Sequence, residues 1–139
     1  MEGLEDFLCF RIGALSRRIV RYYNERLSSY GITLGQLFVL VHLLDHDGCN
    51  LKSIATGVQL ETPAITGLVD RLRLAGLVIK TEDPEDRRNL QVFLTPKGKQ
   101  LADHGLQIAL DFNQTLKNDL IGDDLTALER SLFVMEEYL

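Results

Sequence analysis

A short polar segment carries the residues of this sequence whose types suit contact with phosphates and base edges. Asp86, Arg87 and Arg88 stand together between two β-prone runs. An arginine on a projecting hairpin tip fits the narrow, electronegative minor groove of duplex DNA, and a neighbouring aspartate holds its guanidinium in one geometry by a charge-assisted pair. Mixed charge is also the usual composition of a solvated turn, so this segment alone leaves both interpretations open.

A helix-turn-helix pattern precedes that segment. The apolar spacing indicates two short helices over roughly residues 51–75. Such a pair, joined by a tight turn, is the unit that inserts its second helix into the major groove of DNA. Any two packed helices share this spacing, so the pattern by itself also fits a purely structural helix pair.

The second helix of this pair is predicted to begin at Thr62 and Pro63. Threonine as the cap accepts a bond from an exposed backbone N–H, and proline at the first helical position has no N–H to leave unsatisfied. Small side chains let a helix backbone approach base edges, threonine contacts a base or a thymine methyl, and arginine grips guanine or phosphate. The predicted recognition-helix residues are Thr62, Pro63, Ala64, Thr66, Gly67, Asp70 and Arg71.

The elements that position these residues follow from apolar periodicity and from capping residues. One amphipathic helix is expected over about residues 4–30 and ends at Gly31. A capping box from Thr33 to Gln36 starts a second, buried helix. Residues 45–50 are polar and are expected to form a loop.

Downstream of the helix pair, two β-prone runs at 77–81 and 90–94 flank the polar tip and predict a hairpin. Thr95 and Pro96 repeat the helix-start chemistry and open a long helix, which breaks at Gly122 before a last amphipathic helix. The sequence has no repeat, linker or low-complexity segment. We therefore expect a single domain over the whole chain of 139 residues, mainly α with a small β-hairpin wing.

Charge is divided unevenly along the chain. The formal net charge is −5, which by itself argues against phosphate binding. Residues 101–139, however, hold eight acidic and two basic side chains, so the first hundred residues are nearly balanced, with thirteen basic and twelve acidic. A locally basic face on an acidic protein still attracts phosphate.

Other function classes find little support in the sequence. There is no glycine-rich phosphate loop, acid–base carboxylate cluster or nucleophile–base spacing, so we expect no enzyme and no cofactor. Cys9 and Cys49 form no CxxC pair, and His42 and His46 lack further ligands at metal-binding spacing, so neither a disulfide framework nor a metal site is predicted. An acidic start that includes Glu2, and the lack of a long apolar run, predict a cytoplasmic protein without a membrane segment.

Four stretches between residues 62 and 98 form one pattern. They are Val69-Asp70-Arg71-Leu72, Gly76-Leu77-Val78, Asp86-Arg87-Arg88 and Val92-x-Leu94-Thr95-x-x-Gly98. Together they resemble the signature of the MarR family of winged helix-turn-helix transcriptional regulators. In element order and length the resemblance covers nearly the whole chain.

The resemblance implies an obligate homodimer that represses transcription from a pseudo-palindromic double-stranded DNA operator. Its dimerisation helices would span about residues 4–30 and 96–139, and its winged helix-turn-helix about 33–95. The sequence agrees with this, because its terminal helices present more apolar positions than one small domain can cover, and uncovered apolar stripes favour a partner.

The same resemblance assigns roles to residues around the hairpin. Arg88 would be the minor-groove residue, Asp86 would orient it, and Arg87 would contact a phosphate. Additional candidates for contacts with the DNA backbone are Lys52, Ser53, Lys80 and Lys97.

Regulation by a small molecule is one implication of the resemblance. Members of the family respond to small, often phenolic anions that bind between the dimerisation and DNA-binding lobes. Arg17 and Arg21 lie one turn apart on the first helix and share a face, so they are candidates for such an effector pocket.

Redox sensing through Cys9 is the alternative. Cys9 stands where the organic-hydroperoxide sensors of the family carry their reactive cysteine. Those sensors bond the thiolate with tyrosines, but Gly13 and Leu34 occupy two of the matching positions and only Tyr23 is retained. Because free cysteines are usually buried and a sensor thiol must be ionised, these departures favour a buried, structural Cys9.

An alternative from another class is a winged-helix module that binds proteins rather than DNA. The acidic net charge keeps this alternative open. A steep loss of duplex binding with salt would favour DNA binding, since release of counterions accompanies contact with phosphates.

Overall fold

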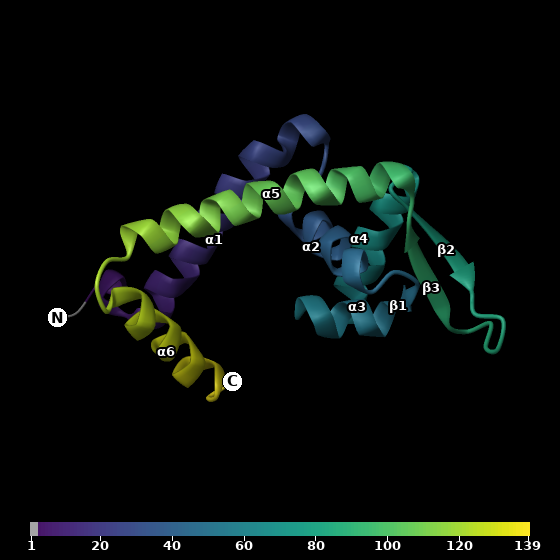
Figure 1. Cartoon of the computed structure of the whole chain (residues 1–139). Helices are drawn as coiled ribbons and strands as arrows, with labels where there is room; N and C mark the ends of the chain where they lie inside the picture. Colours follow the sequence, from purple (N-terminus) through teal and green to yellow (C-terminus); the bar gives the residue numbers. More distant parts are fainter. Residues whose placement is uncertain (1–2) are drawn as a thin grey trace. The chain divides into compact units, whose positions relative to one another are not determined.

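The computed structural model describes residues 3–139, and Glu2 of the acidic start lies outside them. The chain divides into two compact units, one through Leu106 and the other from Gln107 to Leu139. The helices are α1 (Leu8–Leu27), α2 (Leu34–Asp45), α3 (Leu51–Val58), α4 (Thr62–Leu74), α5 (Pro96–Asp119) and α6 (Asp124–Glu136), and the strands are β1 (Cys49–Asn50), β2 (Val78–Glu82) and β3 (Leu90–Leu94) (Figure 1).

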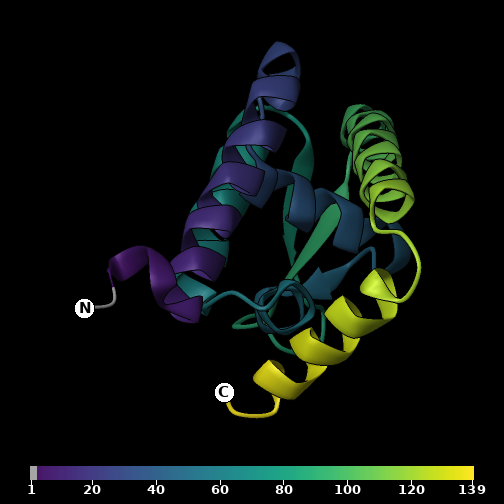
Figure 2. The same cartoon turned by 90° about the vertical axis from the view of Figure 1, so that its left-hand side faces the viewer.

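The first predicted helix is shorter than expected. A 3-10 turn over Leu4–Asp6 comes first, Phe7 is extended, and α1 begins only at Leu8. The carboxylate of Asp6 accepts a bond from the N–H of Gly3 and caps this separate turn. From Leu8 on, α1 is one continuous helix (Figure 2). It ends in a second 3-10 turn that Gly31 closes in the left-handed conformation, at φ +73°.

The hydrophobic core of the first unit forms around α2. The capping box that starts this helix is confirmed, because Thr33 accepts from the N–H of Gln36 while the Gln36 amide oxygen accepts from that of Thr33. Residues of α2 pack against α3, α4 and β3. The fully buried side chains of this core are Leu27, Leu37, Val39, Leu40, Leu43, Ile54, Ile65, Val69, Leu72, Val78 and Val92.

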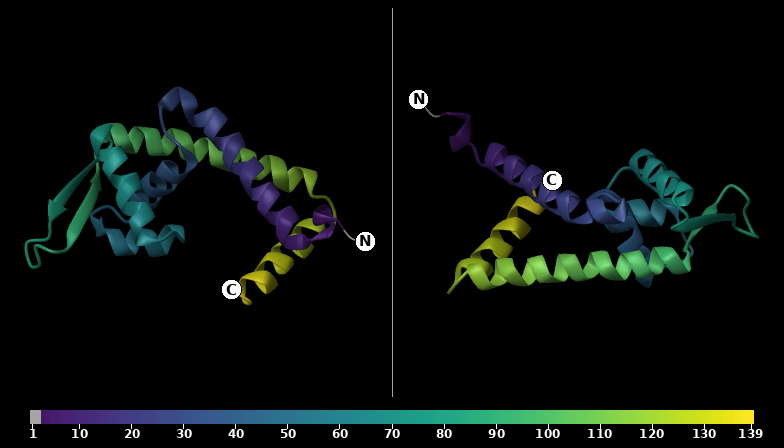
Figure 3. Two further views of the ribbon diagram at one scale, coloured as in Figure 1. Left: turned by 180° about the vertical axis from the view of Figure 1, so that it is seen from behind. Right: turned by 90° about the horizontal axis from the view of Figure 1, so that it is seen from above.

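The predicted hairpin is present and belongs to a three-stranded antiparallel sheet of order β1-β3-β2. The expectation of a plain loop over residues 45–50 is wrong, because Cys49 pairs with Val92 to form β1. Asp47 helps to hold this strand, since its carboxylate accepts a 2.7 Å bond from the N–H of Leu94. The tip between β2 and β3 projects away from the helices of the first unit (Figure 3).

The second unit consists of the end of α5 and of α6. The predicted break at Gly122 is confirmed: this glycine takes φ +61° in the turn between the two helices. Among the described residues of α6, none is buried within this single chain.

No single helix in the described residues is long and apolar enough to cross a membrane. The segments Leu8–Tyr30 and Leu34–Asp45 meet the length and composition test only as a pair bent by 75°. The second of these segments is α2, whose side chains form the protein core, so its apolar composition is explained by packing.

Candidate nucleic-acid interface

The turn between α3 and α4 joins the two helices of the helix-turn-helix unit. Gln59 takes the left-handed conformation there, at φ 57°, and the N–H of Leu60 donates to the carbonyl of Ala55. Glu61 is the N-cap of α4. The prediction that Thr62 caps this helix is therefore wrong: Thr62 is its first residue, and its carbonyl accepts a 3.1 Å bond from the hydroxyl of Thr66.

Helix α4 has one buried face and one outward face. Ile65, Val69 and Leu72 are fully buried and fix the rotation of the helix on the core. The outward face is made of small and polar residues at its start and of arginines at its end. Of the predicted recognition residues, Thr62, Pro63, Ala64, Gly67 and Arg71 are exposed, whereas Thr66 and Asp70 are half-buried.

Asp70 links α4 to the sheet. Its carboxylate accepts a 2.8 Å bond from the ammonium of Lys80 on β2 and lies 4.0 Å from Arg73. The hydrogen bond and charge of Lys80 lower the pKa of Asp70 below its usual 3.8. The structure thus pairs two residues that the sequence predicted separately, one for the recognition helix and one for DNA-backbone contact.

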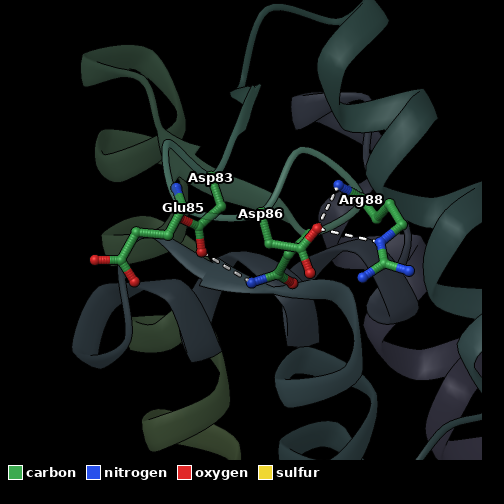
Figure 4. Close-up of polar contacts among 5 residues, drawn as sticks. Asp83, Glu85, Asp86 and Arg88 are labelled. Atoms are coloured by element: carbon green, nitrogen blue, oxygen red, sulfur yellow. Dashed lines mark hydrogen bonds and ion pairs between the residues drawn. The ribbon is translucent and has the colours of Figure 1, made fainter.

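The hairpin tip presents an arginine on an ordered loop. Asp86 accepts from the backbone N–H of Arg88 at 3.0 Å and from its guanidinium Nε at 3.3 Å (Figure 4). The side chain of Arg88 is nevertheless 93% exposed, and Arg87 beside it is exposed as well. One carboxylate therefore restrains a guanidinium that remains open to solvent.

A second carboxylate closes the base of the tip. Asp83 accepts a 2.9 Å bond from the N–H of Glu85 and a 3.1 Å bond from the side-chain amide of Asn89. The bond from Glu85, followed by that from Asn89, lowers the pKa of Asp83. The pairing of Asp83 with Asn89 could not be predicted from the sequence, because the two residues are six positions apart and only the closed loop brings them together.

The base of the hairpin is held by both neighbouring helices. Gly76 ends α4 at φ +74°, and the Thr95 hydroxyl donates 2.7 Å to its carbonyl while accepting from the N–H of Gly98. A side chain at Gly98 would overlap the carbonyl of Leu77. Lys97, predicted as a backbone contact, donates to the carbonyl of Ala75 at 3.3 Å.

Helix α3 presents two further predicted residues. Lys52 and Ser53 are exposed in its first turn. Asn50 caps this helix by accepting a 2.8 Å bond from the N–H of Ser53. This cap was missed at the sequence level although asparagine before an apolar helical pattern is a usual signal for one.

His42, His46 and Cys49 line one surface hollow together with residues of α3. The rings of His42 and His46 stack with centroids 4.5 Å apart, and burial lowers the pKa of His42. Burial likewise raises the pKa of the half-buried Cys49 thiol. Within the described part of the chain, no three His, Cys, Asp or Glu side chains are placed to hold a metal ion.

The predicted regulatory residues lie on α1. Cys9 is exposed, so the expectation that it is buried is wrong for the single chain. Arg17 and Arg21 line one shallow, open depression of about 540 Å³ on the surface of α1, whose other lining residues are Val20, Asn24, Glu25 and Ser28.

These features define a class of protein: a helix-turn-helix followed by a hairpin wing, with arginines exposed on both. Residues 32–90 match the model of the MarR family. The chain is 31% identical over 116 residues to the HTH-type transcriptional regulator SarZ of Staphylococcus epidermidis, covering 84% of this chain and 76% of that protein. The chain therefore belongs to the MarR family and is a DNA-binding transcriptional regulator, not an enzyme.

Solved structures show the same fold. The Staphylococcus aureus MepR–DNA complex superimposes with a TM-score of 0.90 at 23% identity, covering 96% of this chain and 98% of that one. CouR of Rhodococcus jostii RHA1 bound to p-coumaroyl-CoA gives a TM-score of 0.75 at 28% identity, covering 96% and 93%.

Asp70→Asn tests the link between α4 and β2. We expect a small drop in the thermal midpoint at pH 7, because the pair is partly exposed. A lowered carboxyl pKa contributes stability above the usual value of 3.8 and loses it as pH falls through the folded-state value. The difference between wild type and variant should therefore shrink below about pH 4 in thermal melts.

The control for this prediction is Asp103→Asn, at an exposed carboxylate on α5. It should leave the midpoint unchanged at every pH. Equal behaviour of the two variants would contradict a stabilising role for the bond between Asp70 and Lys80.

Proposed function

We propose that this protein is a homodimeric repressor that binds a pseudo-palindromic duplex operator and releases it when a small phenolic anion binds. The observation that carries the proposal is the bond from the Thr95 hydroxyl to the Gly76 carbonyl, which joins the end of the hairpin to the end of α4. Both elements carry exposed arginines. The family assignment favours this function over a module that binds only proteins.

In this proposal α4 enters the major groove. Its outward face begins with small residues, which let the helix backbone come close to base edges. Arg71, one turn after Gly67 and exposed, then reaches guanine or a phosphate. Thr66 keeps acceptor capacity for a base or a water, since its hydroxyl hydrogen is used by the Thr62 carbonyl.

The wing would insert Arg88 into the adjacent minor groove. The bonds that Arg88 donates to Asp86 limit the conformations of the arginine before DNA arrives, which reduces the entropy lost on binding. Arg87 would contact a phosphate beside it. Lys52 and Ser53 would add phosphate contacts from α3. Lys80 and Lys97 already donate to Asp70 and to the Ala75 carbonyl, so a phosphate would share their ammonium groups with these acceptors.

Dimerisation explains the exposed apolar side chains of both units. In the first unit, α1 exposes Leu8, Phe10, Ile12 and Leu15, each at 43% or more. In the second unit, α6 exposes Leu128, Leu132, Phe133 and Val134 to a similar extent. Helices with this much uncovered apolar surface are stabilised by a second copy of the chain, and a dimer would match the two halves of a pseudo-palindrome.

An anionic effector would bind at the shallow depression on α1. Arg17 and Arg21 supply two guanidiniums to it, and guanidinium groups bind carboxylates and phosphates by paired hydrogen bonds. The related CouR binds p-coumaroyl-CoA, a ligand that combines a phenol with negatively charged phosphates. This relative provides a precedent for an effector with a phenol and negative charge.

Redox control through Cys9 is the second candidate. The observation that favours it is the exposure of Cys9 in the first turn of α1. Oxidants reach an exposed thiol, and its first oxidation products are reversible, as a sensor requires.

Arg88→Ala tests the wing. We expect it to weaken binding to a duplex selected by the wild-type protein from a random pool by about 1–3 kcal/mol, because a minor-groove contact is lost. Fluorescence anisotropy measures the affinity, and size exclusion checks that the oligomeric state is unchanged. Arg130→Ala on α6 is the matched control and should bind as wild type does. Wild-type affinity in the Arg88 variant would remove this residue from the proposed interface.

Arg21→Ala tests the effector site and separates the two forms of regulation. Salicylate, used as a phenolic anion, should release DNA from wild type, from Arg18→Ala and from Cys9→Ser. The Arg21→Ala variant should need a salicylate concentration about tenfold higher for the same release of DNA, since one charged hydrogen bond is lost. Release by cumene hydroperoxide that is absent in Cys9→Ser, with salicylate inert on every form, would instead support redox control.

A further inference from the structure

Gly67 stands in the middle of α4, where a glycine is costly. It lies five residues after the start of the helix and seven before its end. Glycine in a helix interior is less stable than alanine because it loses more backbone freedom on folding. A glycine at this position therefore needs a reason.

Eight of the ten other glycines in the described residues have a reason within the protein. Gly13, inside α1, has none and serves as the control below. Backbone conformation explains one group, which takes positive φ and consists of Gly31, Gly48, Gly76 and Gly122. Close packing explains another group, in which an added Cβ would meet a neighbouring element; these are Gly35 against Leu68, Gly57 against His42, Gly98 against Leu77 and Gly105 against Leu37.

Gly67 fits neither group. Its φ is negative, and a Cβ built on it meets no heavy atom of residues 3–139 within 4 Å, apart from its own helix backbone and chain neighbours. Its residue is exposed. Nothing in the described part of the protein excludes a side chain here. The glycine therefore destabilises the helix, and neither packing nor backbone geometry compensates for this.

The neighbours of Gly67 on the outward face of α4 are also informative. Ala64, three residues before, is exposed and ends in a methyl group, and Arg71, four residues after, is exposed and long. The carboxylate of Asp70 is bonded to the Lys80 ammonium on β2 at 2.8 Å and does not extend this area. The outward face of α4 thus has a low, apolar area at residues 64 and 67, followed by an arginine.

We propose that Gly67 determines sequence specificity: the DNA, not the protein, excludes a side chain at this position. This inference rests on the proposed insertion of α4 into the major groove. There the Cα of Gly67 and the methyl of Ala64 lie against a base-pair edge, and the space between them takes the 5-methyl group of a thymine, since apolar contact is how small side chains recognise that base.

The test begins with Gly67→Ala in the full-length protein. The added methyl group should raise the thermal midpoint by about 2–5 °C, through helix propensity alone. The same variant should bind the duplex selected by wild type about tenfold more weakly, with binding to a scrambled duplex unchanged. Gly13→Ala in α1 is the matched control, because its Cβ would meet only the end of the Arg17 side chain; it should stabilise the protein and leave both affinities as they are.

Deoxyuridine placed at each thymine of the selected half-site in turn identifies the base. At one position, loss of the thymine methyl should weaken binding by wild type severalfold and leave or improve binding by Gly67→Ala, since the alanine methyl then occupies the vacated space. Equal effects of deoxyuridine on both proteins at every position would overturn the thymine contact.

Three further results would overturn the proposal. Wild-type affinity of Gly67→Ala for the selected duplex would show that position 67 does not face the bases, and an equal loss on scrambled duplex would show a general effect on docking. A lowered thermal midpoint would show that the fold itself needs this glycine. If wild type selects no duplex at all, the proposed function fails first, and this inference fails with it.

Discussion

The junction where α4, the hairpin and α5 meet is the constraint on which the rest of the interface depends. The Thr95 hydroxyl donates to the Gly76 carbonyl and accepts from Gly98, so one side chain bonds the end of the helix to the start of the next. Because Gly98 has no side chain, α5 starts directly against the Leu77 carbonyl. The bond between Asp70 and Lys80 adds a second link farther along α4. Together these contacts fix the direction of the wing relative to the recognition helix.

Much of the fold could be predicted from the sequence because its signals are local. Apolar spacing, the capping box at Thr33, the helix stop at Gly76 and the proline start at Pro96 each depend on residues within a few positions of one another. The wing motif likewise placed Asp86 beside Arg88, and the two are bonded in the structure. The resemblance to the family then supplied the order in which these local elements assemble.

The features that could not be predicted depend on contacts between distant residues. Strand β1 has two residues and exists only because β3 lies beside it, so its sequence carries no strand pattern. Asp70 was predicted from its place in the recognition helix and Lys80 from its place by the hairpin, but nothing in the sequence showed that the two side chains lie 2.8 Å apart. The burial expected of Cys9 followed from the general behaviour of cysteine and failed because the start of α1 is exposed in the single chain.

The central claim is that α4 and the wing bind duplex DNA together through phosphates and base edges. Its most direct test is a fluorescence-anisotropy titration of wild-type protein with a selected and a scrambled duplex over a series of salt concentrations. The account predicts that the selected duplex binds more tightly by at least about a thousandfold, and that log affinity falls steeply with log salt because phosphate contacts release counterions. Equal affinity for both duplexes, or affinity that does not change with salt, would contradict it.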